Sequence, residues 1–137
     1  SSHLDAGLKR RISAICSFLN KSAYCVAHNT NTLMTKHGGD GEGWDFSAED
    51  VAKLLDPAYV PDYPSEKAAI EYARAASSDH SNVPRATLDA LAEHMTPPQI
   101  VELACVVGFW AMYNSIHEAL HIPIEEALQG NAAFLGA

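Results

Sequence analysis

The fold is organised around the stretch TPPQIVELACVVGFWAMYNSIH, residues 96–117. Its opening predicts a helix start, because Thr96 is a favoured N-cap, Pro97 suits the first helical position and Gln99 can complete a capping box. The residues that follow are apolar on almost every side of a helix, which is typical of a helix in the middle of a domain or in a subunit interface. Glu102 and later polar residues make the run too polar for a membrane span. We therefore expect a long central helix that is buried in the core.

Helical spacing of apolar residues continues on both sides of this stretch. Apolar residues recur at intervals of three and four, and N-cap residues precede several of these segments. The helices predicted in this way cover residues 4–19, 22–36, 47–55, 65–73, 85–94 and 124–128. A glycine-rich loop is predicted at residues 37–46, and no segment alternates with the period of a strand. The fold class is therefore all-α, a helical bundle, and the length fits one domain over residues 1–137.

The composition excludes several kinds of partner. The net charge is −8 because 17 Asp and Glu outnumber 9 Lys and Arg, so no basic surface is available for a nucleic acid or an anionic membrane. The three cysteines, Cys16, Cys25 and Cys105, are an odd number in apolar or helical contexts, unlike the cysteines of a disulfide-stapled secreted protein. No targeting segment is visible at the N-terminus. We expect a soluble, cytoplasmic protein with no nucleic-acid partner and no membrane partner.

The segment SAYCVAH, residues 22–28, holds the residues that suggest chemistry. Ser22 is a predicted N-cap, so Cys25 falls in the first turn of a helix, where unpaired backbone N–H groups and the helix dipole stabilise a thiolate. His28 lies one turn later on the same face, where its ring could relay a proton or pair with the thiolate. The alternative is structural, with Cys25 as a small buried apolar residue and His28 as a polar residue that caps or bridges.

Residues 20–28, NKSAYCVAH, resemble the NGCxYCxxHH segment of the alkylhydroperoxidase D-like, carboxymuconolactone decarboxylase superfamily. Residues 84–120 resemble the turn and the long apolar helix of the same family. The resemblance covers most of the chain but lacks the family's usual N-terminal segment, as in a truncated or separately produced piece. It implies an alkylhydroperoxidase D-like helical bundle without a cofactor. It also implies a homo-oligomer, a trimer or hexamer, in which apolar helices pack across symmetry axes.

The resemblance further implies roles for individual residues. In the family the second cysteine of a Cys-x-x-Cys pair is peroxidatic, the first resolves its sulfenic acid, and a glutamate and a histidine relay protons. Cys25 matches the peroxidatic cysteine, whereas Ser22 stands at the resolving position and cannot form a disulfide. Asn29 stands at the relay histidine, with His28 one residue earlier, and Arg10 stands about where the relay glutamate is expected.

Three functions follow from this partial match. The leading expectation is a divergent one-cysteine peroxidase or thiol-redox enzyme, in which Cys25 is oxidised to a sulfenic acid, an external thiol reduces it and His28 assists. Cys16 and Cys105 are expected to face the core and so not to act as a resolving cysteine. The alternatives are a non-catalytic oligomeric or ligand-binding scaffold, and a cysteine-independent, decarboxylase-like acid–base enzyme that uses His28 and Arg10 on a carboxylated substrate.

His117 and His121 form a second candidate site. Histidines at positions i and i+4 point from one helix face and can share a metal, but Glu118 points partly away and no other ligand has helical spacing. A solvated or interface-facing helix end is the simpler explanation, so we expect no metal.

Overall fold

The computed structural model describes residues 2–38 and 42–136, and within them the chain is a bundle of helices without strands. The predicted all-α class is therefore confirmed. The helices, in chain order, are α1 (Ala6–Leu19), α2 (Ala23–Met34), α3 (Ala48–Leu55), α4 (Pro64–Ser78), α5 (Arg85–His94), α6 (Pro97–Ala119) and the 3-10 helix η1 (Glu126–Leu135). Residues 39–41 of the predicted glycine-rich loop lie outside the described residues.

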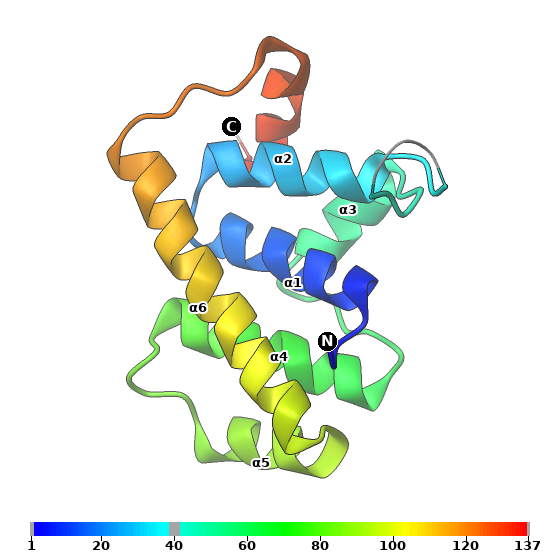
Figure 1. The fold of residues 1–137 in the computed structure, drawn as a ribbon, viewed down its shortest axis with the longest axis vertical. Coiled ribbons are helices and arrows are strands. Elements are labelled where there is room, and N and C mark those ends of the chain that lie inside the picture. The colour runs from blue at the N-terminus through cyan, green and yellow to red at the C-terminus, as the bar shows by residue number, and fades with distance from the viewer. Residues whose placement is uncertain (1, 39–41, 137) are drawn as a thin grey trace.

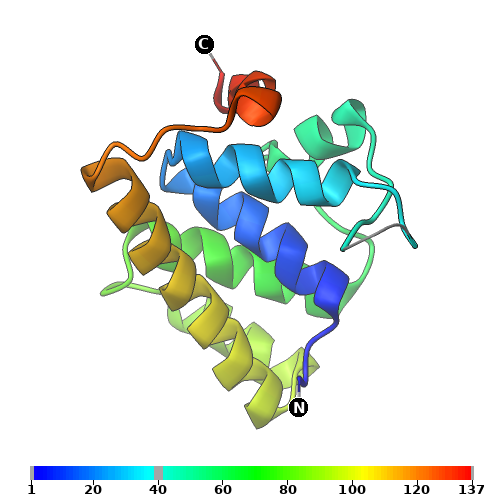
Figure 2. The same ribbon diagram turned by 45° about the horizontal axis from the view of Figure 1, so that its top comes forward.

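Helix α1 lies at the centre of the bundle and packs against α2, α4 and α6 (Figure 1). Helix α5 packs on α4, and η1 covers the side of α2 that faces away from α1, as Figure 2 shows from above. The core between these helices is filled by fully buried aliphatic side chains, among them Ile12, Leu33, Val51, Ile70 and Leu103. This arrangement leaves the N-terminus of α2 between α6 and the segment that leads into η1.

Most of the predicted helix starts are observed. Thr96 and Gln99 form the expected reciprocal capping box at the start of α6, and Ser22 caps α2. The predicted cap at Ser65 is wrong, because α4 begins at Pro64, whose fixed φ angle suits the first helical position. No side chain caps that end.

Helix α6 is long and central, as expected, but the prediction that it is buried is wrong for most of its length. Its buried side chains are Leu103, Val107, Asn114 and His117. These lie on one stripe of the helix, because α6 crosses the bundle obliquely and contacts α1, α2 and α4 with a single side (Figure 1). The exposed apolar side chains of α6 and its C-cap form what we call the open face of α6; they are Val101, Phe109, Met112, Tyr113, Ile116 and Leu120.

The expectation that this run is too polar for a membrane span is wrong, because by length and composition α6 is long and apolar enough to cross a membrane. An 18-residue window has a mean hydropathy of 1.3, and only 17% of that window is buried. Two of its acidic residues nevertheless make polar contacts within the bundle. Glu102 accepts hydrogen bonds from the backbone N–H groups of His3 and Leu4, and Glu118 accepts one from the backbone N–H of Ala23. These contacts fix α6 against α1 and α2.

The C-terminal helix differs from its prediction in both type and length. Residues 124–128 were expected to be helical, whereas the 3-10 helix η1 starts at Glu126 and continues to Leu135. It packs along α2, where the side chain of Asn131 donates a hydrogen bond to the backbone carbonyl of Ala27 at 3.2 Å. This packing brings the residue just before η1, Glu125, to the exposed edge of α2.

Candidate active site

The turn between α1 and α2 places Cys25 in the wall of the candidate site. Lys21 adopts a left-handed conformation, with φ of 57°, and this reverses the chain between the two helices. Ser22 then returns to an extended conformation, and its hydroxyl oxygen accepts a hydrogen bond from the backbone N–H of Cys25 at 3.4 Å. Cys25 is therefore held in the first turn of α2, as the sequence predicts.

The thiol of Cys25 is not activated in the way expected from the sequence. Its side chain is 1% exposed, and burial raises its pKa because the thiolate loses water. The hydrogen bond with Ser22 lowers the pKa by a smaller amount, and the nearby Glu118 carboxylate raises it. Because Glu118 also accepts a hydrogen bond from the N–H of Ala23, a negative charge offsets the positive end of the α2 dipole. The surroundings of Cys25 therefore raise the pKa of its thiol, where the sequence predicts a lowered one.

A polar pocket of about 230 Å³ adjoins Cys25. Its walls come from α1, α2 and α6, so it is assembled by the packing of three helices. The lining residues are Arg10, Tyr24, Cys25, His28, Asn29, Thr32, Trp110 and Tyr113. Most of these side chains carry a hydrogen-bonding group, so the wall near the thiol is suited to a polar substrate rather than closed by apolar packing.

His28 is paired with Glu125, a residue that the sequence analysis missed. The His28 Nε2 atom lies 2.6 Å from Oε2 of Glu125, and the Tyr24 hydroxyl donates to Oε1 of the same carboxylate at 3.3 Å. The pKa of Glu125 is lowered, first by its own backbone N–H and then by the hydrogen bond from His28. An ionised carboxylate only accepts, so Nε2 carries the hydrogen and, in the neutral ring, Nδ1 is the nitrogen that can take a proton.

The rings near the pocket form a continuous stack. Tyr24 lies between His28 and His117, with ring centroids 4.4 Å and 4.3 Å away. The ring centroids of His117 and Tyr113 are 4.2 Å apart. The Nδ1 atom of His117 also lies 2.8 Å from the backbone carbonyl oxygen of Tyr113. The stack fixes the plane of the His28 ring and joins α2 to α6.

Arg10 and Asn29, which the resemblance places at the relay positions, form a structural link between α1 and α2. The Arg10 Nη1 atom donates to Oδ1 of Asn29 at 2.7 Å, and the Asn29 amide nitrogen donates to the hydroxyl of Ser17 at 3.0 Å. Asn29 is 1% exposed and so is fully engaged as a core polar residue. Arg10 remains at the pocket wall, where its second terminal nitrogen pairs with Glu42 at 2.6 Å.

The other two cysteines lie apart from this pocket's wall. Cys16 is buried, as expected, and burial raises the pKa of its thiol to about 11. The expectation that Cys105 faces the core is wrong, because Cys105 is exposed on α6. It is two positions from the buried Leu103 and therefore on the opposite side of the helix.

The histidine pair proposed from the sequence does not converge in the structure. His117 belongs to α6 and is engaged with Tyr24 and Tyr113, whereas His121 lies beyond the end of the helix with φ of 52°. Within residues 2–38 and 42–136, no group of three His, Cys, Asp or Glu side chains is arranged to hold a metal ion.

Sequence reasoning missed Glu125, Trp110 and Tyr113 as residues of the site. Glu125 is 97 positions from His28, and no local pattern links the two. Tyr113 and Trp110 belong to the apolar helix predicted to begin at Thr96 and to end near His121, where aromatic residues are ordinary packing residues.

The fold and the site together define an all-helical bundle that carries a cysteine–histidine pocket at the N-terminus of a helix. A solved structure with this fold is that of the debrominase Bmp8, in its apo form. The two structures superpose with a TM-score of 0.78 at 20% sequence identity, over 98% of this chain and 68% of the debrominase chain. The sequence matches no protein-family model and no curated protein. The likeness to the debrominase establishes the fold.

Proposed function

We propose that this protein is a thiol-dependent reductase of small electrophiles, of the alkylhydroperoxidase D-like type. Cys25 attacks the electrophile, and His28 accepts the proton of the Cys25 thiol. One observation carries the proposal: Cys25 and the His28–Glu125 pair line or adjoin a single polar pocket. The motif at residues 20–28 and the shared fold of a debrominase support the same class. A hydroperoxide is the first substrate to test, and a brominated organic compound is the second.

In the reaction with a hydroperoxide, Cys25 is first oxidised and is then reduced by external thiols. His28 accepts the Cys25 proton at Nδ1, and the thiolate attacks the terminal peroxide oxygen. The O–O bond breaks, the alkoxide takes the proton from His28 and leaves as an alcohol, and Cys25 becomes a sulfenic acid. An external thiol then displaces water to form a mixed disulfide, and a second thiol releases Cys25 as an external disulfide forms.

In this scheme Glu125 positions the base. Its carboxylate holds the Nε2 hydrogen of His28, so Nδ1 is the available nitrogen, and it stabilises the imidazolium that forms. Tyr24 shares that carboxylate and stacks on the ring, which restricts the ring's rotation.

The decisive assay is the consumption of dithiothreitol that depends on cumene hydroperoxide. We expect turnover by the unmodified protein and none above background by Cys25→Ser. Cys105→Ser is the matched control, since Cys105 is exposed and does not line the Cys25 pocket. Equal rates for the Cys25→Ser and unmodified proteins would refute the proposal and favour a non-catalytic scaffold.

A second candidate is acid–base chemistry without sulfur, as in the decarboxylase branch of the resembled family. It is favoured by one specific observation, namely that Arg10 and His28 line the same pocket. In this case Arg10 binds a carboxylate of the substrate and His28 transfers a proton. Activity on a carboxylated substrate that survives Cys25→Ser but not His28→Asn distinguishes this candidate from the thiol mechanism.

We also propose that the open face of α6 is covered by other copies of this chain, as a trimer or hexamer. The face is uncharged and apolar, and it includes Phe109 at 46% exposure and Met112 at 55%. Exposed apolar surface of this kind is unfavourable in water and favours association. Tyr113 belongs to both the open face and the Cys25 pocket, so such an assembly would border the site.

A further inference from the structure

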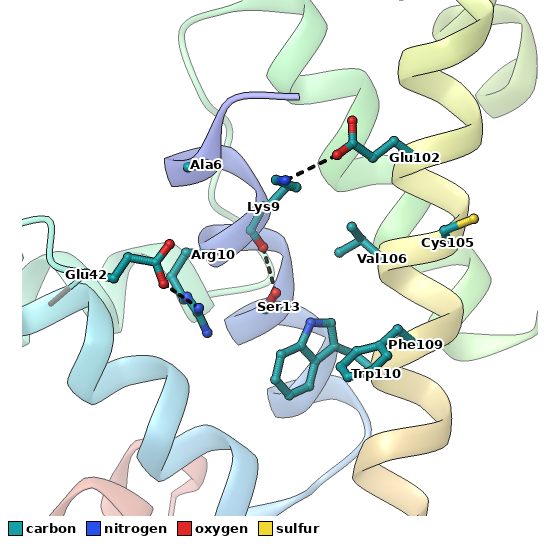
Figure 3. A pocket seen from close by; sticks show the side chains of 10 residues that line it. All are labelled: Ala6, Lys9, Arg10, Ser13, Glu42, Glu102, Cys105, Val106, Phe109 and Trp110. Carbon is teal, nitrogen blue, oxygen red and sulfur yellow. Dashed lines mark hydrogen bonds and ion pairs between the residues drawn. The ribbon is translucent and has the colours of Figure 1, made fainter. Parts of the chain in front are cut away.

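A second and larger pocket lies between α1 and α6, with a volume of about 400 Å³. Figure 3 shows its two sides. Lys9 and Arg10 project from α1, whereas Phe109 and Trp110 project from α6, and the Trp110 indole lies between the two helices. We call this pocket the α1–α6 groove. Its volume is in the range that holds a small organic ligand, about 300–1,000 Å³.

Each of the two cations in the groove is already paired with a carboxylate. Lys9 contacts Glu102 at 3.1 Å, and Glu102 is anchored by three further hydrogen bonds to residues near the N-terminus. Arg10 contacts Glu42 at 2.6 Å. Glu42 has no second side-chain bond among the described residues, and its side chain is 47% exposed. Of the two carboxylates, Glu42 is therefore the one that a ligand can replace at low cost.

We propose that the α1–α6 groove binds a small planar organic anion. The anion's carboxylate takes the place of the Glu42 carboxylate on Arg10, and its ring lies against Trp110. The contact between Glu42 and Arg10 shows that one terminal nitrogen of Arg10 holds a carboxylate oxygen at this position. A guanidinium group is well suited to this exchange because it binds carboxylates in a fixed, planar arrangement. The aromatic wall favours a flat apolar body over a short aliphatic one.

The groove and the Cys25 pocket have two lining residues in common. Arg10 and Trp110 line both. The Cys25 pocket, at about 230 Å³, is the smaller of the two. The binding proposal does not depend on the chemistry at Cys25, because occupancy of the groove is measurable without turnover.

The test is titration with benzoate, observed through the indole N–H signals in proton–nitrogen NMR spectra. The chain has two tryptophans, and Trp44→Phe identifies the signal of Trp110. We expect saturable movement of the Trp110 signal with benzoate and at least tenfold weaker binding of benzamide, which has the same shape without the charge. Arg10→Gln should weaken benzoate binding about tenfold or more, as for the loss of a charge-assisted pair.

Glu42→Gln gives a prediction of opposite sign. It removes the competing carboxylate, so benzoate binding should tighten several-fold, because the fraction of protein with a free Arg10 increases. Matched controls with the same charge changes at exposed positions elsewhere are Arg85→Gln and Glu49→Gln, which should leave the affinity within about twofold. This pair also separates binding at Arg10 from a general effect of net charge.

Three results would overturn the inference. They are equal affinity for benzoate and benzamide, movement of the Trp44 signal in place of the Trp110 signal, and no saturable binding to Glu42→Gln at about 10 mM benzoate. Each of these leaves the proposed thiol chemistry untouched, since that is decided by Cys25→Ser. Conversely, the absence of activity at Cys25 would not contradict the proposed anion site.

Discussion

Replacement of Ser22 by alanine should weaken both the fold and the thiol site. The Ser22 hydroxyl accepts a hydrogen bond from the backbone N–H of Cys25 at 3.4 Å, and the side chain is fully buried. In Ser22→Ala this N–H loses its partner without gaining water. The same hydroxyl lowers the pKa of the Cys25 thiol by hydrogen bonding to it, so the variant also loses a group that stabilises the thiolate.

The expected size of the stability effect follows from helix capping. Loss of an N-cap serine costs about 1 kcal/mol, and for a chain of this length that corresponds to a fall in Tm of about 3–4 °C. The 3.4 Å length of the bond places Ser22 at the lower end of the capping range. The Cys25 pKa moves upward, because burial and Glu118 continue to oppose the thiolate after the hydroxyl is gone.

Two measurements separate these effects. Thermal unfolding followed by circular dichroism gives the change in Tm, and the rate of Cys25 alkylation by iodoacetamide against pH gives the thiol titration. Ser47→Ala is the matched control, since Ser47 caps α3 in the same manner and therefore lowers Tm without moving the alkylation profile. An unchanged profile in Ser22→Ala would refute the role assigned to the hydroxyl, even with a lower Tm.

Three further predictions concern the rest of the site and the surface. Glu125→Gln should lower hydroperoxide turnover at least about tenfold, because His28 loses its carboxylate partner, whereas Glu126→Gln, at the exposed next position, should not; equal rates would contradict the positioning role. Ile116→Glu should convert an oligomer to monomers in light scattering, with Val60→Glu, exposed on the connector before α4, as the control, and a monomeric unmodified protein would contradict the proposed assembly. The pKa of Glu102 is lowered to about 2, first by the hydrogen bond from Ser2, so its stabilising contribution is present above its ordinary pKa of 4.5 and is lost as pH falls through about 2. Glu102→Gln should therefore lower the urea midpoint near neutral pH but not near pH 2, and an equal difference at both pH values would exclude this titration.

Local features of the fold were predictable from the sequence, because they depend on residues a few positions apart. The capping box at Thr96 and Gln99 and the end of α5 at His94 are of this kind. The burial of α6 was not predictable, because an apolar helix has the same composition whether neighbours surround it or contact one side. Only the packing of α1, α2 and α4 against a single stripe decides this.

The residues of the candidate site also divide into those that local spacing predicts and those that it does not. Cys25 and His28 are one helical turn apart, so their proximity follows from spacing alone. The groups that determine their chemistry come from distant positions: Glu118 is 95 residues from the α2 N-terminus at Ala23, and Glu125 is 97 residues from His28. Helix-dipole reasoning predicted a lowered pKa for the Cys25 thiol, whereas burial and then the Glu118 carboxylate raise that pKa.

The position of Glu125 has a consequence for the order in which the protein is made. Glu125 lies just before η1, the last helix of the chain, which packs on α2. A ribosome-bound chain that has completed α1 and α2 already contains Cys25 and its serine cap, but His28 does not yet have its carboxylate. His28 therefore acquires its carboxylate partner only after the C-terminal segment has emerged and docked on α2.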